Sequence, residues 1–204
     1  MARGTSSGNY YTVDKTYSGA TALSVSMWIY YSTDADATMA GLWEDLATTQ
    51  QWLLAKNASN QLGGIIFDSA VRVAVGGTMS KNAWQHTAFT FASSDLVRAF
   101  INGSQVATAA VGGGGLATRT QSFGVGARQA GNGAFAGRVA ELAIWTSRLT
   151  ADQIASLSKG FAPPKVLKPD FYAPIVREMI DVTNKYTFTT VGTPTAESHP
   201  RIYK

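Results

Sequence analysis

Carboxylates and histidines are the residues of this sequence that could carry acid–base chemistry, and their spacing does not favour catalysis. Glu44 and Asp45 are adjacent, so on a strand their side chains point to opposite faces. They cannot form the pair of carboxyl groups, about 5 Å apart, that retaining glycoside hydrolysis requires. Two histidines, His86 and His199, are present, but no nucleophile elbow supplies a serine for a Ser-His-Asp triad. The sequence therefore predicts a protein that is not an enzyme.

Glu141 is a lone carboxylate in an apolar strand. The alternation of residues 139–145 places Glu141 on the same face as Val139 and opposite to Leu142. We interpret Glu141 as a structural group that is hydrogen-bonded to loop backbone or paired with an arginine such as Arg138. Catalysis by this carboxylate is the alternative.

Acidic residues also raise the question of a metal site. Asp34 and Asp36 share one loop, and calcium prefers about six to eight oxygen ligands with two or three carboxylates among them. Asp34, Asp36 and Glu141 are therefore candidate calcium ligands, with solvated loop carboxylates as the alternative. Because the chain contains no cysteine, a zinc-thiolate site is excluded. Apart from calcium, no cofactor is expected.

Tryptophans are the usual stacking platforms for sugars, and the chain has five of them. Most lie in alternating segments and should face a core, which is the expectation for at least three of the five. Trp43 and Trp52 lie near expected loops. These two are the candidate glycan contacts.

Three segments in the middle of the chain have the period of two that is typical of strands. They are residues 84–91, the pair of strands within residues 96–109, and residues 135–145. Between the paired strands, Asn102-Gly103 suits a type I′ turn, because both central residues of that turn need positive φ. A hairpin is the prediction here.

A short helix is expected after these strands. Thr150 and Gln153 have the spacing of a capping box, and Gly160 lies where a left-handed residue ends a helix. Its apolar residues Ile154 and Leu157 should pack on the edge of a sandwich.

The order of these segments, WQHTAFTF, VRAFINGSQVAT, FAGRVAELAIW and LTADQIASL, resembles the laminin-G-like jelly roll of the concanavalin A-type lectin and glucanase fold. The resemblance implies an all-β antiparallel jelly-roll sandwich with one short helix, an architecture that usually binds rather than catalyses. Glucanases of this superfamily carry E-x-D-x-x-E on one strand, which this sequence lacks. Where the family often has Asp-Glu, the chain has Ala140-Glu141, and this weakens the calcium site. The family commonly has a histidine at the position of His86, which implies a structural role.

The remaining strands and loops fit the short spacing of such a sandwich. Further strands are expected at Asn9–Val13, Leu23–Tyr31, Gly41–Leu46, Gln51–Ala55, Gly63–Asp68, Val71–Val75 and Gln121–Ala127, and loops at Thr33–Thr38, Asn57–Gln61 and Gly112–Gly115, the last as a hairpin tip.

Both ends of the chain are expected to form extended arms around a domain of residues 21–160. Residues 1–20 hold an N-terminal arm with a first strand, and residues 161–204 form a C-terminal arm in which Pro163-Pro164 stops the helix. The C-terminal arm looks like the tails of laminin-G-like proteins encoded by bacteriophages. It would lie back across the sandwich or reach a neighbouring subunit, and removing residues 163–204 should leave a folded domain. The assembly residues would be Tyr10, Tyr11, Phe171, Tyr172, Tyr186, Phe188, Ile202 and Tyr203.

Composition limits the classes of partner. The 204 residues are 45% hydrophobic and carry a net charge of +4, which lies almost entirely in the terminal segments and is interleaved there with acidic residues. Binding to nucleic acid needs clustered cations, so it is not expected. No basic and apolar leader opens the chain and no apolar run reaches the roughly 18 residues of a membrane span. We expect a protein without a signal peptide or membrane segment.

Two functions from different classes are consistent with these patterns. The first is a non-catalytic structural protein of a phage particle, a capsid decoration or cement protein made in the host cytoplasm, whose arms bind other copies or the major capsid protein. The second is a carbohydrate-binding adhesin or tail-fibre receptor-binding module, in which loops at one rim bind glycans. Apolar, aromatic arms favour the first, and a polar rim with aromatic residues would favour the second.

Overall fold

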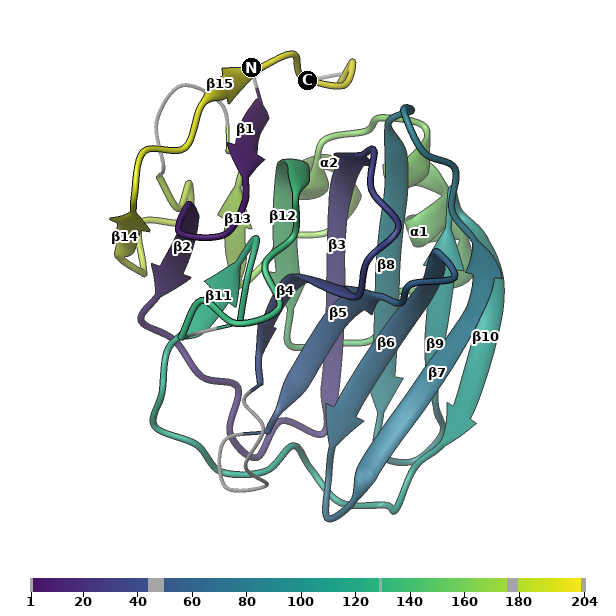
Figure 1. Ribbon diagram of the computed structural model, residues 1–204. Helices are drawn as coiled ribbons and strands as arrows, with labels where there is room; N and C mark the ends of the chain where they lie inside the picture. Colours follow the sequence, from purple (N-terminus) through teal and green to yellow (C-terminus); the bar gives the residue numbers. More distant parts are fainter. Residues whose placement is uncertain (1, 44–49, 129, 176–179, 203–204) are drawn as a thin grey trace.

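The computed structural model describes residues 2–43, 50–128, 130–175 and 180–202, and folds them into two antiparallel sheets packed face to face (Figure 1). The eight-stranded sheet has the order β10 (Ser104–Ala110), β9 (Leu96–Ile101), β8 (Gln85–Ala92), β3 (Ala22–Tyr31), β12 (Gly137–Trp145), β1 (Ala2–Thr5) and β15 (Ala196–Glu197), with β13 (Phe171–Ala173) beside β12. The seven-stranded sheet has the order β14 (Phe188–Val191), β2 (Tyr10–Val13), β11 (Phe123–Val125), β4 (Ala37–Leu42), β5 (Trp52–Lys56), β6 (Gln61–Phe67) and β7 (Val71–Thr78). The predicted all-β sandwich is confirmed.

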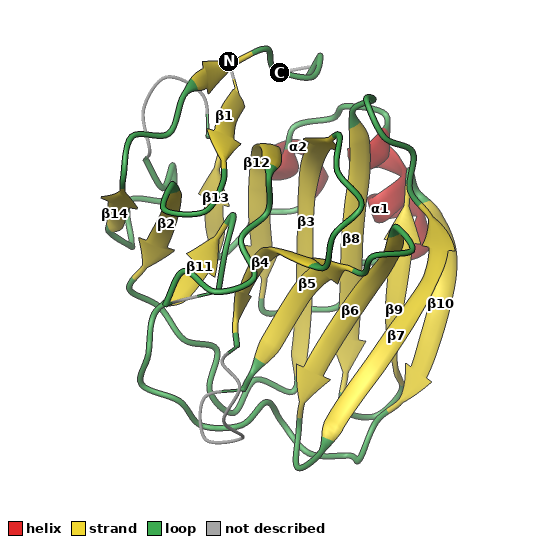
Figure 2. Cartoon of the chain, in the orientation of Figure 1, coloured by secondary structure: helices red, strands yellow, loops and turns green. Residues whose placement is uncertain are grey.

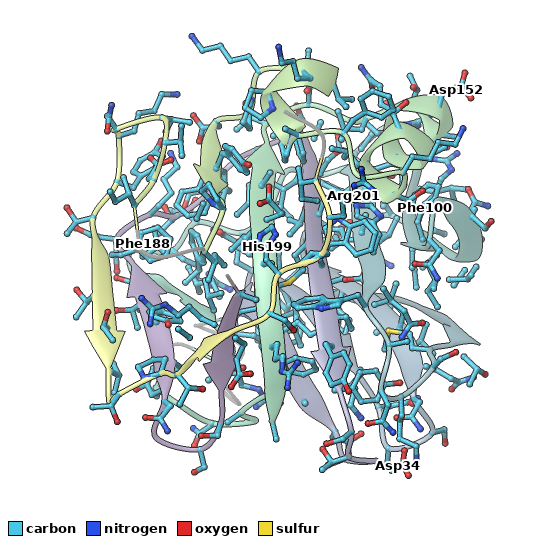
Figure 3. The ribbon with its side chains drawn as sticks, turned by 90° about the horizontal axis from the view of Figure 1, so that it is seen from above. Asp34, Phe100, Asp152, Phe188, His199 and Arg201 are labelled. Carbon is cyan, nitrogen blue, oxygen red and sulfur yellow. The ribbon has the colours of Figure 1, made fainter. Side chains whose placement is uncertain are left out.

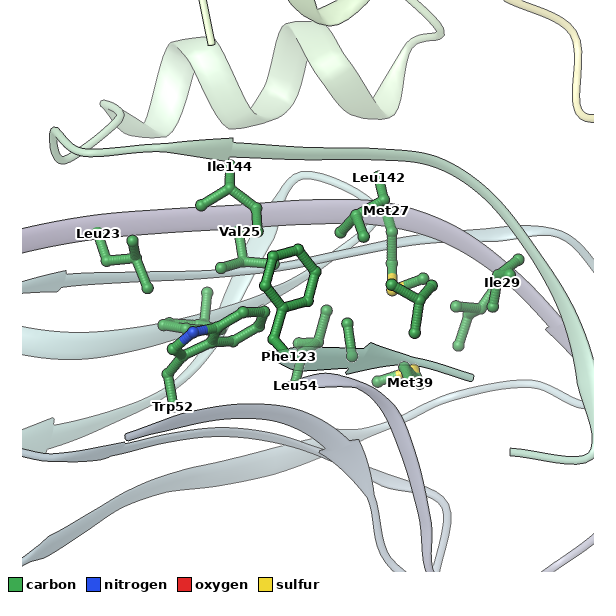
Figure 4. Packing of buried hydrophobic residues seen from close by; sticks show 14 of the residues in the cluster. Leu23, Val25, Met27, Ile29, Met39, Trp52, Leu54, Phe123, Leu142 and Ile144 are labelled. Carbon is green, nitrogen blue, oxygen red and sulfur yellow. The ribbon is translucent and has the colours of Figure 1, made fainter. Parts of the chain in front are cut away.

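The core lies between the sheets and follows from alternation along the strands. On β3, the side chains of Leu23, Val25, Met27, Ile29 and Tyr31 are fully buried between the sheets, as the period of two predicts (Figure 4). From the opposite sheet, Trp52 and Phe123 pack with ring centroids 5.3 Å apart. The intervening β3 residues must then face outward, and one of them, Tyr30, belongs to the site described below.

Two helices cover part of the outer face of the eight-stranded sheet, where one was expected (Figure 2). The predicted capping box of α1 (Ala151–Ser158) is present, with Thr150 Oγ1 accepting from the backbone N–H of Gln153, and Gly160 has φ +88°. The second helix, α2 (Pro163–Val166), begins at the prolines that were expected to give extended chain. Proline suits the first turn of a helix, because the N–H that it lacks has no partner there.

The predicted hairpin is confirmed, and its turn lies against α1. Asn102 and Gly103 have φ values of +48° and +85°, as a type I′ turn requires. A Cβ at Gly103 would lie 2.6 Å from Ser158 Oγ and 3.0 Å from the Cα of Ala155, both on α1. Glycine is therefore needed here both for its φ and for the close approach of the helix.

We expect Gly103→Ala to lower the free energy of unfolding by about 2 to 4 kcal/mol, because it combines a left-handed alanine with a steric clash. Gly113→Ala is the matched control, since Gly113 also has φ +85° but a Cβ there meets nothing within 4 Å. The control should lose only about 1 to 2 kcal/mol. Urea denaturation of both variants measures the difference, and equal losses would contradict the role given to the helix contact.

Other expected boundaries differ from the structure. The strand expected at Gly41–Leu46 is β4, which begins at Ala37 inside the expected loop and ends at Leu42; residues 44–46 lie outside the described residues. The expected strand Gln121–Ala127 is reduced to β11, because Gly126 has φ +81°. The glycine run at Gly112–Gly115 is not a hairpin tip, because it lies in the connection from β10 in one sheet to β11 in the other.

The terminal segments complete the two sheets rather than extending from them. β1 pairs with the first part of β12 and β13 with its second part, while β14 pairs with β2 and β15 with β1. Phe171 and Ile175 belong to the main core. The chain ends therefore lie back across the sandwich, which is the first of the two arrangements expected. The core contains residues from both sides of the domain boundary expected at residue 161.

This placement corrects the expected assembly residues. Tyr11, Phe171 and Tyr172 are buried, so they offer no surface to a partner. Tyr10, Tyr186, Phe188 and Ile202 are half-buried, and two of these, Tyr186 and Phe188, pack against the core. Tyr203 lies outside the described residues. The aromatic content of the arms therefore reflects packing within the chain.

Candidate functional site

A row of aromatic and cationic side chains crosses the outer face of the eight-stranded sheet. Arg138 of β12 pairs with Tyr30 of β3, and Trp84 directly precedes β8 on the other side of β3. The Arg138 guanidinium lies 4.6 Å from the Tyr30 ring centroid, and the Tyr30 and Trp84 ring centroids are 6.0 Å apart. Because Ile29 and Tyr31 point into the core, Tyr30 must point outward. Tyr30 and Trp84 are both half-buried.

A hollow of about 370 Å³ opens beside this row, and polar side chains line it. The N-terminal strand and turn form one wall, and the segment around β15 forms the rim; both chain ends lie close together there (Figure 1). Besides Tyr30, the lining includes Ser6, Asn9, Ser32, Arg138, Thr195 and Glu197. Hydroxyl, amide, carboxylate and guanidinium groups thus surround the outward-facing Tyr30.

Local hydrogen bonds hold this wall and rim together. Asn9 donates from Nδ2 to Ser6 Oγ at 3.0 Å, and its Oδ1 accepts from the backbone N–H of Thr193 at 2.8 Å. Gly4 donates its backbone N–H to the carbonyl of Thr195 at 3.0 Å, and a Cβ at Gly4 would lie 2.5 Å from Thr195 Oγ1. The two ends of the chain can approach each other here because residue 4 has no side chain.

This arrangement can bind a polyhydroxylated ligand. Aromatic faces pack against the apolar faces of a ligand, while a few placed polar groups fix its orientation. The hollow holds donors (Arg138, Asn9) and acceptors (Glu197, and the hydroxyl of Thr195) around Tyr30. No charge relay or proton transfer is needed for such binding.

Glu141 lies apart from the described lining of this hollow, in a buried polar cluster. Tyr172 donates from its hydroxyl to Glu141 Oε2 at 2.5 Å, and His199 Nε2 lies 2.9 Å from Glu141 Oε1. Figure 3 shows His199 over β12. Burial, with the neighbouring Glu141 carboxylate, raises the pKa of Tyr172 well above its usual value. The contacts of the Glu141 carboxylate differ from both expected partners, loop backbone and an arginine, because they are Tyr172 and His199. Arg138 pairs with Glu197 instead.

The strand carrying Glu141 also departs from strict alternation. The β3–β12 register shifts between Ala140 and Ala143, and Glu141 has φ +55°, a conformation that is uncommon for a residue other than glycine. The bulge puts Val139 and Leu142 in the same core, whereas alternation placed them on opposite faces. The bulge lies between the part of β12 that pairs with β1 and the part that pairs with β13, so both of these strands pair with the same edge of β12.

His86 has a structural environment. It is fully buried, and its Nε2 lies 2.7 Å from Ser26 Oγ. Burial lowers the pKa of His86 to about 3, so the ring is neutral at physiological pH. Its Nδ1 has no hydrogen-bond partner among the described residues, so no acid orients this histidine as a triad requires.

The candidate calcium ligands are not brought together. Asp34 accepts from Lys81 Nζ and from Asn60 Nδ2, which lower the pKa of its carboxyl group, and Asp36 accepts from the backbone N–H of Ala58. Glu141 is occupied by Tyr172 and His199. Over the parts of the chain that the structure describes, no three acidic or histidine side chains are placed to hold a metal ion. The expected calcium set is therefore corrected to separate structural carboxylates. Glu44 and Asp45 lie outside the described residues.

The expected glycan-stacking tryptophans are also corrected. Trp52 is fully buried in the core and Trp43 is 8% exposed, because both lie in or beside strands of the seven-stranded sheet. Trp28 and Trp84 are the half-buried tryptophans on the outer face of the other sheet. The signal was present in the alternation of β3, since placing Met27, Ile29 and Tyr31 in the core leaves Trp28 and Tyr30 outside.

A second, smaller hollow of about 210 Å³ lies on the outer face of the seven-stranded sheet. Its apolar floor includes Leu53, Ile65 and Val75, and Lys56 and Arg128 lie at its side. Lys56 is buried and already donates to the carbonyl of Ala35 at 2.6 Å. With no aromatic residue in its described lining, this hollow fits a sugar less well than the first.

Comparisons with known proteins agree with this architecture. The model of the concanavalin A-like lectin/glucanases superfamily matches residues 4–155. The sequence has no match among the curated proteins. None of the helices among the described residues is long and apolar enough to cross a membrane.

Several solved structures are similar to this chain. A candidate carbohydrate binding protein from Bacteroides ovatus is 17% identical with a TM-score of 0.70, and the match covers 96% of this chain and 61% of that protein. A heptameric pentraxin from Limulus polyphemus is 13% identical with a TM-score of 0.65, and the match covers 92% of this chain and 87% of the pentraxin. The binding domain of botulinum neurotoxin serotype D is 16% identical with a TM-score of 0.60, and the match covers 78% of this chain and 41% of the neurotoxin chain. At these identities the likeness establishes the fold, and the chain spans only part of the Bacteroides protein.

Proposed function

Since this chain belongs to the concanavalin A-like lectin/glucanases superfamily, we propose that it is a non-catalytic carbohydrate-binding domain whose ligand lies in the hollow beside Tyr30. The observation that carries the proposal is the row of Arg138, Tyr30 and Trp84 next to a polar rim built from both chain ends. Sugars need this combination, because they present apolar ring faces and many hydroxyl groups.

Two further observations support a binding role without catalysis. The lining of the hollow contains one carboxylate, Glu197, whereas glycoside hydrolysis by the usual mechanisms uses two. The buried Glu141 accepts from the Tyr172 hydroxyl, and His199 Nε2 lies 2.9 Å from its other carboxylate oxygen, so both oxygens have protein neighbours. Two similar structures, a candidate carbohydrate binding protein from Bacteroides ovatus and the receptor binding domain of a botulinum neurotoxin, are consistent with this role.

The proposal predicts that Tyr30→Ala lowers the affinity for a bound glycan by about tenfold or more, roughly 1.4 kcal/mol, because the central aromatic contact is lost. A glycan array first identifies the ligand, and isothermal titration then compares the variant with the native protein. Val73→Ala, on the seven-stranded sheet, is the control, since Val73 is 46% exposed and outside the hollow. An unchanged affinity in Tyr30→Ala would place the ligand elsewhere.

A second candidate function is a structural role in a bacteriophage particle, as a capsid decoration protein that binds other copies or the major capsid protein. The observation that favours it is a stripe of exposed apolar residues on β7, an edge strand of the seven-stranded sheet: Val71, Val73 and Val75. Light scattering of the protein alone and with capsid shells tests it. A defined oligomer or saturable binding to shells would support the role, and a monomer indifferent to shells would argue against it.

A further inference from the structure

We propose that Glu197 acts as an internal substitute for the carboxylate of an acidic sugar, so that the hollow prefers glycans ending in a uronate or a similar carboxylated residue. This inference rests on the proposed function and adds the chemical class of the ligand. In this proposal Arg138 determines the specificity for the ligand, and the carboxylate of the ligand takes the place of the Glu197 carboxylate.

Arg138 is placed as a carboxylate receptor. Its guanidinium lies over the Tyr30 ring, 4.6 Å from the centroid, and its side chain is one-third exposed at the hollow. Glu197 Oε2 lies 3.2 Å from Arg138 Nε, and Arg138 Nη1 donates to Ser198 Oγ at 3.1 Å. A guanidinium offers a planar fork of donors whose geometry suits a carboxylate. The native contacts come from two separate residues of the C-terminal segment, and one ligand carboxylate could replace both.

Glu197 is held loosely enough to be displaced. It belongs to β15, which consists of two residues and pairs only with Ala2 and Arg3 of β1. Its side chain is 29% exposed and that of Arg138 is 33% exposed, and an ion pair that stays in contact with solvent contributes little to stability. Its other carboxylate oxygen accepts from Thr195 Oγ1 at 2.9 Å, a contact within the same segment. Moving the Glu197 side chain therefore disturbs none of the core.

The ligand class follows from charge. When the Glu197 side chain moves away from Arg138, the positive charge of the guanidinium has lost its negative partner. A neutral sugar cannot supply a new one. A carboxylated sugar does supply one, and it also brings hydroxyl groups to the polar rim near Asn9 and Ser6. Because Arg138 stays partly open to solvent, we expect the preference for the acidic glycan to weaken at high salt.

Titration calorimetry with two oligosaccharides that differ only in their terminal residue, glucuronate or glucose, tests the inference. Glu197→Gln keeps the size of the side chain and removes its charge, so it should raise affinity for the glucuronate-ended ligand about tenfold and change affinity for the glucose-ended ligand less than twofold. Glu197→Ala should act in the same direction. Arg138→Lys, which keeps the charge without the fork, should remove most of the preference. Asp152→Asn, an exposed acid on α1 outside the hollow, should change neither affinity.

The outcomes separate the inference from the function on which it rests. If both ligands bind in a manner that depends on Tyr30 but Glu197→Gln changes both affinities equally or not at all, the inference is overturned and the carbohydrate site stands. If the glucuronate-ended ligand gains from Glu197→Gln and loses from Arg138→Lys, both stand. If neither ligand binds any of these proteins, both fail.

Discussion

Removal of residues 163–204 is expected to unfold the protein rather than to release a stable domain. The segment supplies β13, whose residue Phe171 is fully buried and packs against Phe123 with ring centroids 5.5 Å apart. Losing the Phe171 side chain alone should cost about 3 to 5 kcal/mol, and a domain of this kind is stable by only about 5 to 15 kcal/mol. The deletion also removes Ile175 from the core and the carbonyl of Leu167 that accepts from Trp145 Nε1 at 2.8 Å.

Circular dichroism and urea denaturation of the shortened chain measure this effect. A chain that ends at Gly192 is the control, because it keeps β13 and β14 and loses residues 193–204, of which only β15 is a strand. The control should unfold cooperatively, at a lower urea concentration than the full chain because the His199 contact to Glu141 is gone. A cooperative transition in the chain that ends before residue 163 would show that the C-terminal strands are dispensable.

Acidification from pH 7 to pH 5 is expected to destabilise the protein by about 2 kcal/mol through His86 alone. Burial lowers the pKa of His86 in the folded protein to about 3 from an ordinary value of 6.5. Between these two values the unfolded chain binds a proton that the folded protein does not bind. The stabilisation is therefore complete above pH 6.5 and is lost as the pH falls toward 3. Asp34 and Asp68, whose pKa values are lowered from an ordinary value of 3.8, stay ionised in both the folded and the unfolded chain between pH 7 and pH 5, so they do not contribute to this change.

Urea denaturation at pH 7, 6 and 5 tests this linkage. His86→Gln should lose the pH dependence between pH 7 and 5, whatever its effect on stability at pH 7, because the titrating group is gone. His199→Gln is the control for the other histidine and should keep the slope that arises from His86. A native protein equally stable at pH 7 and pH 5 would contradict the prediction.

Much of the fold could be predicted where local signals act alone. The alternation of β3, the type I′ turn at Asn102-Gly103 and the capping box at Thr150 each depend on a few neighbouring residues, and the structure confirms all three. Long-range pairing could not be predicted in the same way. The strands of the chain ends are short, and only their partners β12, β1 and β2 show that they belong to the sheets. For this reason the terminal segments were expected to be arms.

The candidate site was missed for related reasons. It needs Arg138 and Tyr30 from paired strands together with Glu197 from the far end of the chain, and sequence spacing does not reveal that these residues meet. Glu141 illustrates a second limit, because a bulge of one extra residue reverses the face predicted by alternation. Tyr30 alone could have been found, since the core assignment of Ile29 and Tyr31 leaves it exposed.

The most direct test of the account is to observe the indole N–H resonances of the five tryptophans by NMR while the glycan identified on an array is added to isotopically labelled protein. Trp84→Phe assigns the resonance of the tryptophan beside Tyr30, and the resonance of the buried Trp52 serves as an internal reference. We expect a saturable shift of the Trp84 resonance that needs about tenfold more glycan in Tyr30→Ala, with little change at Trp52. Binding that leaves the Trp84 resonance unmoved would show that the sugar does not lie against the row of Arg138, Tyr30 and Trp84.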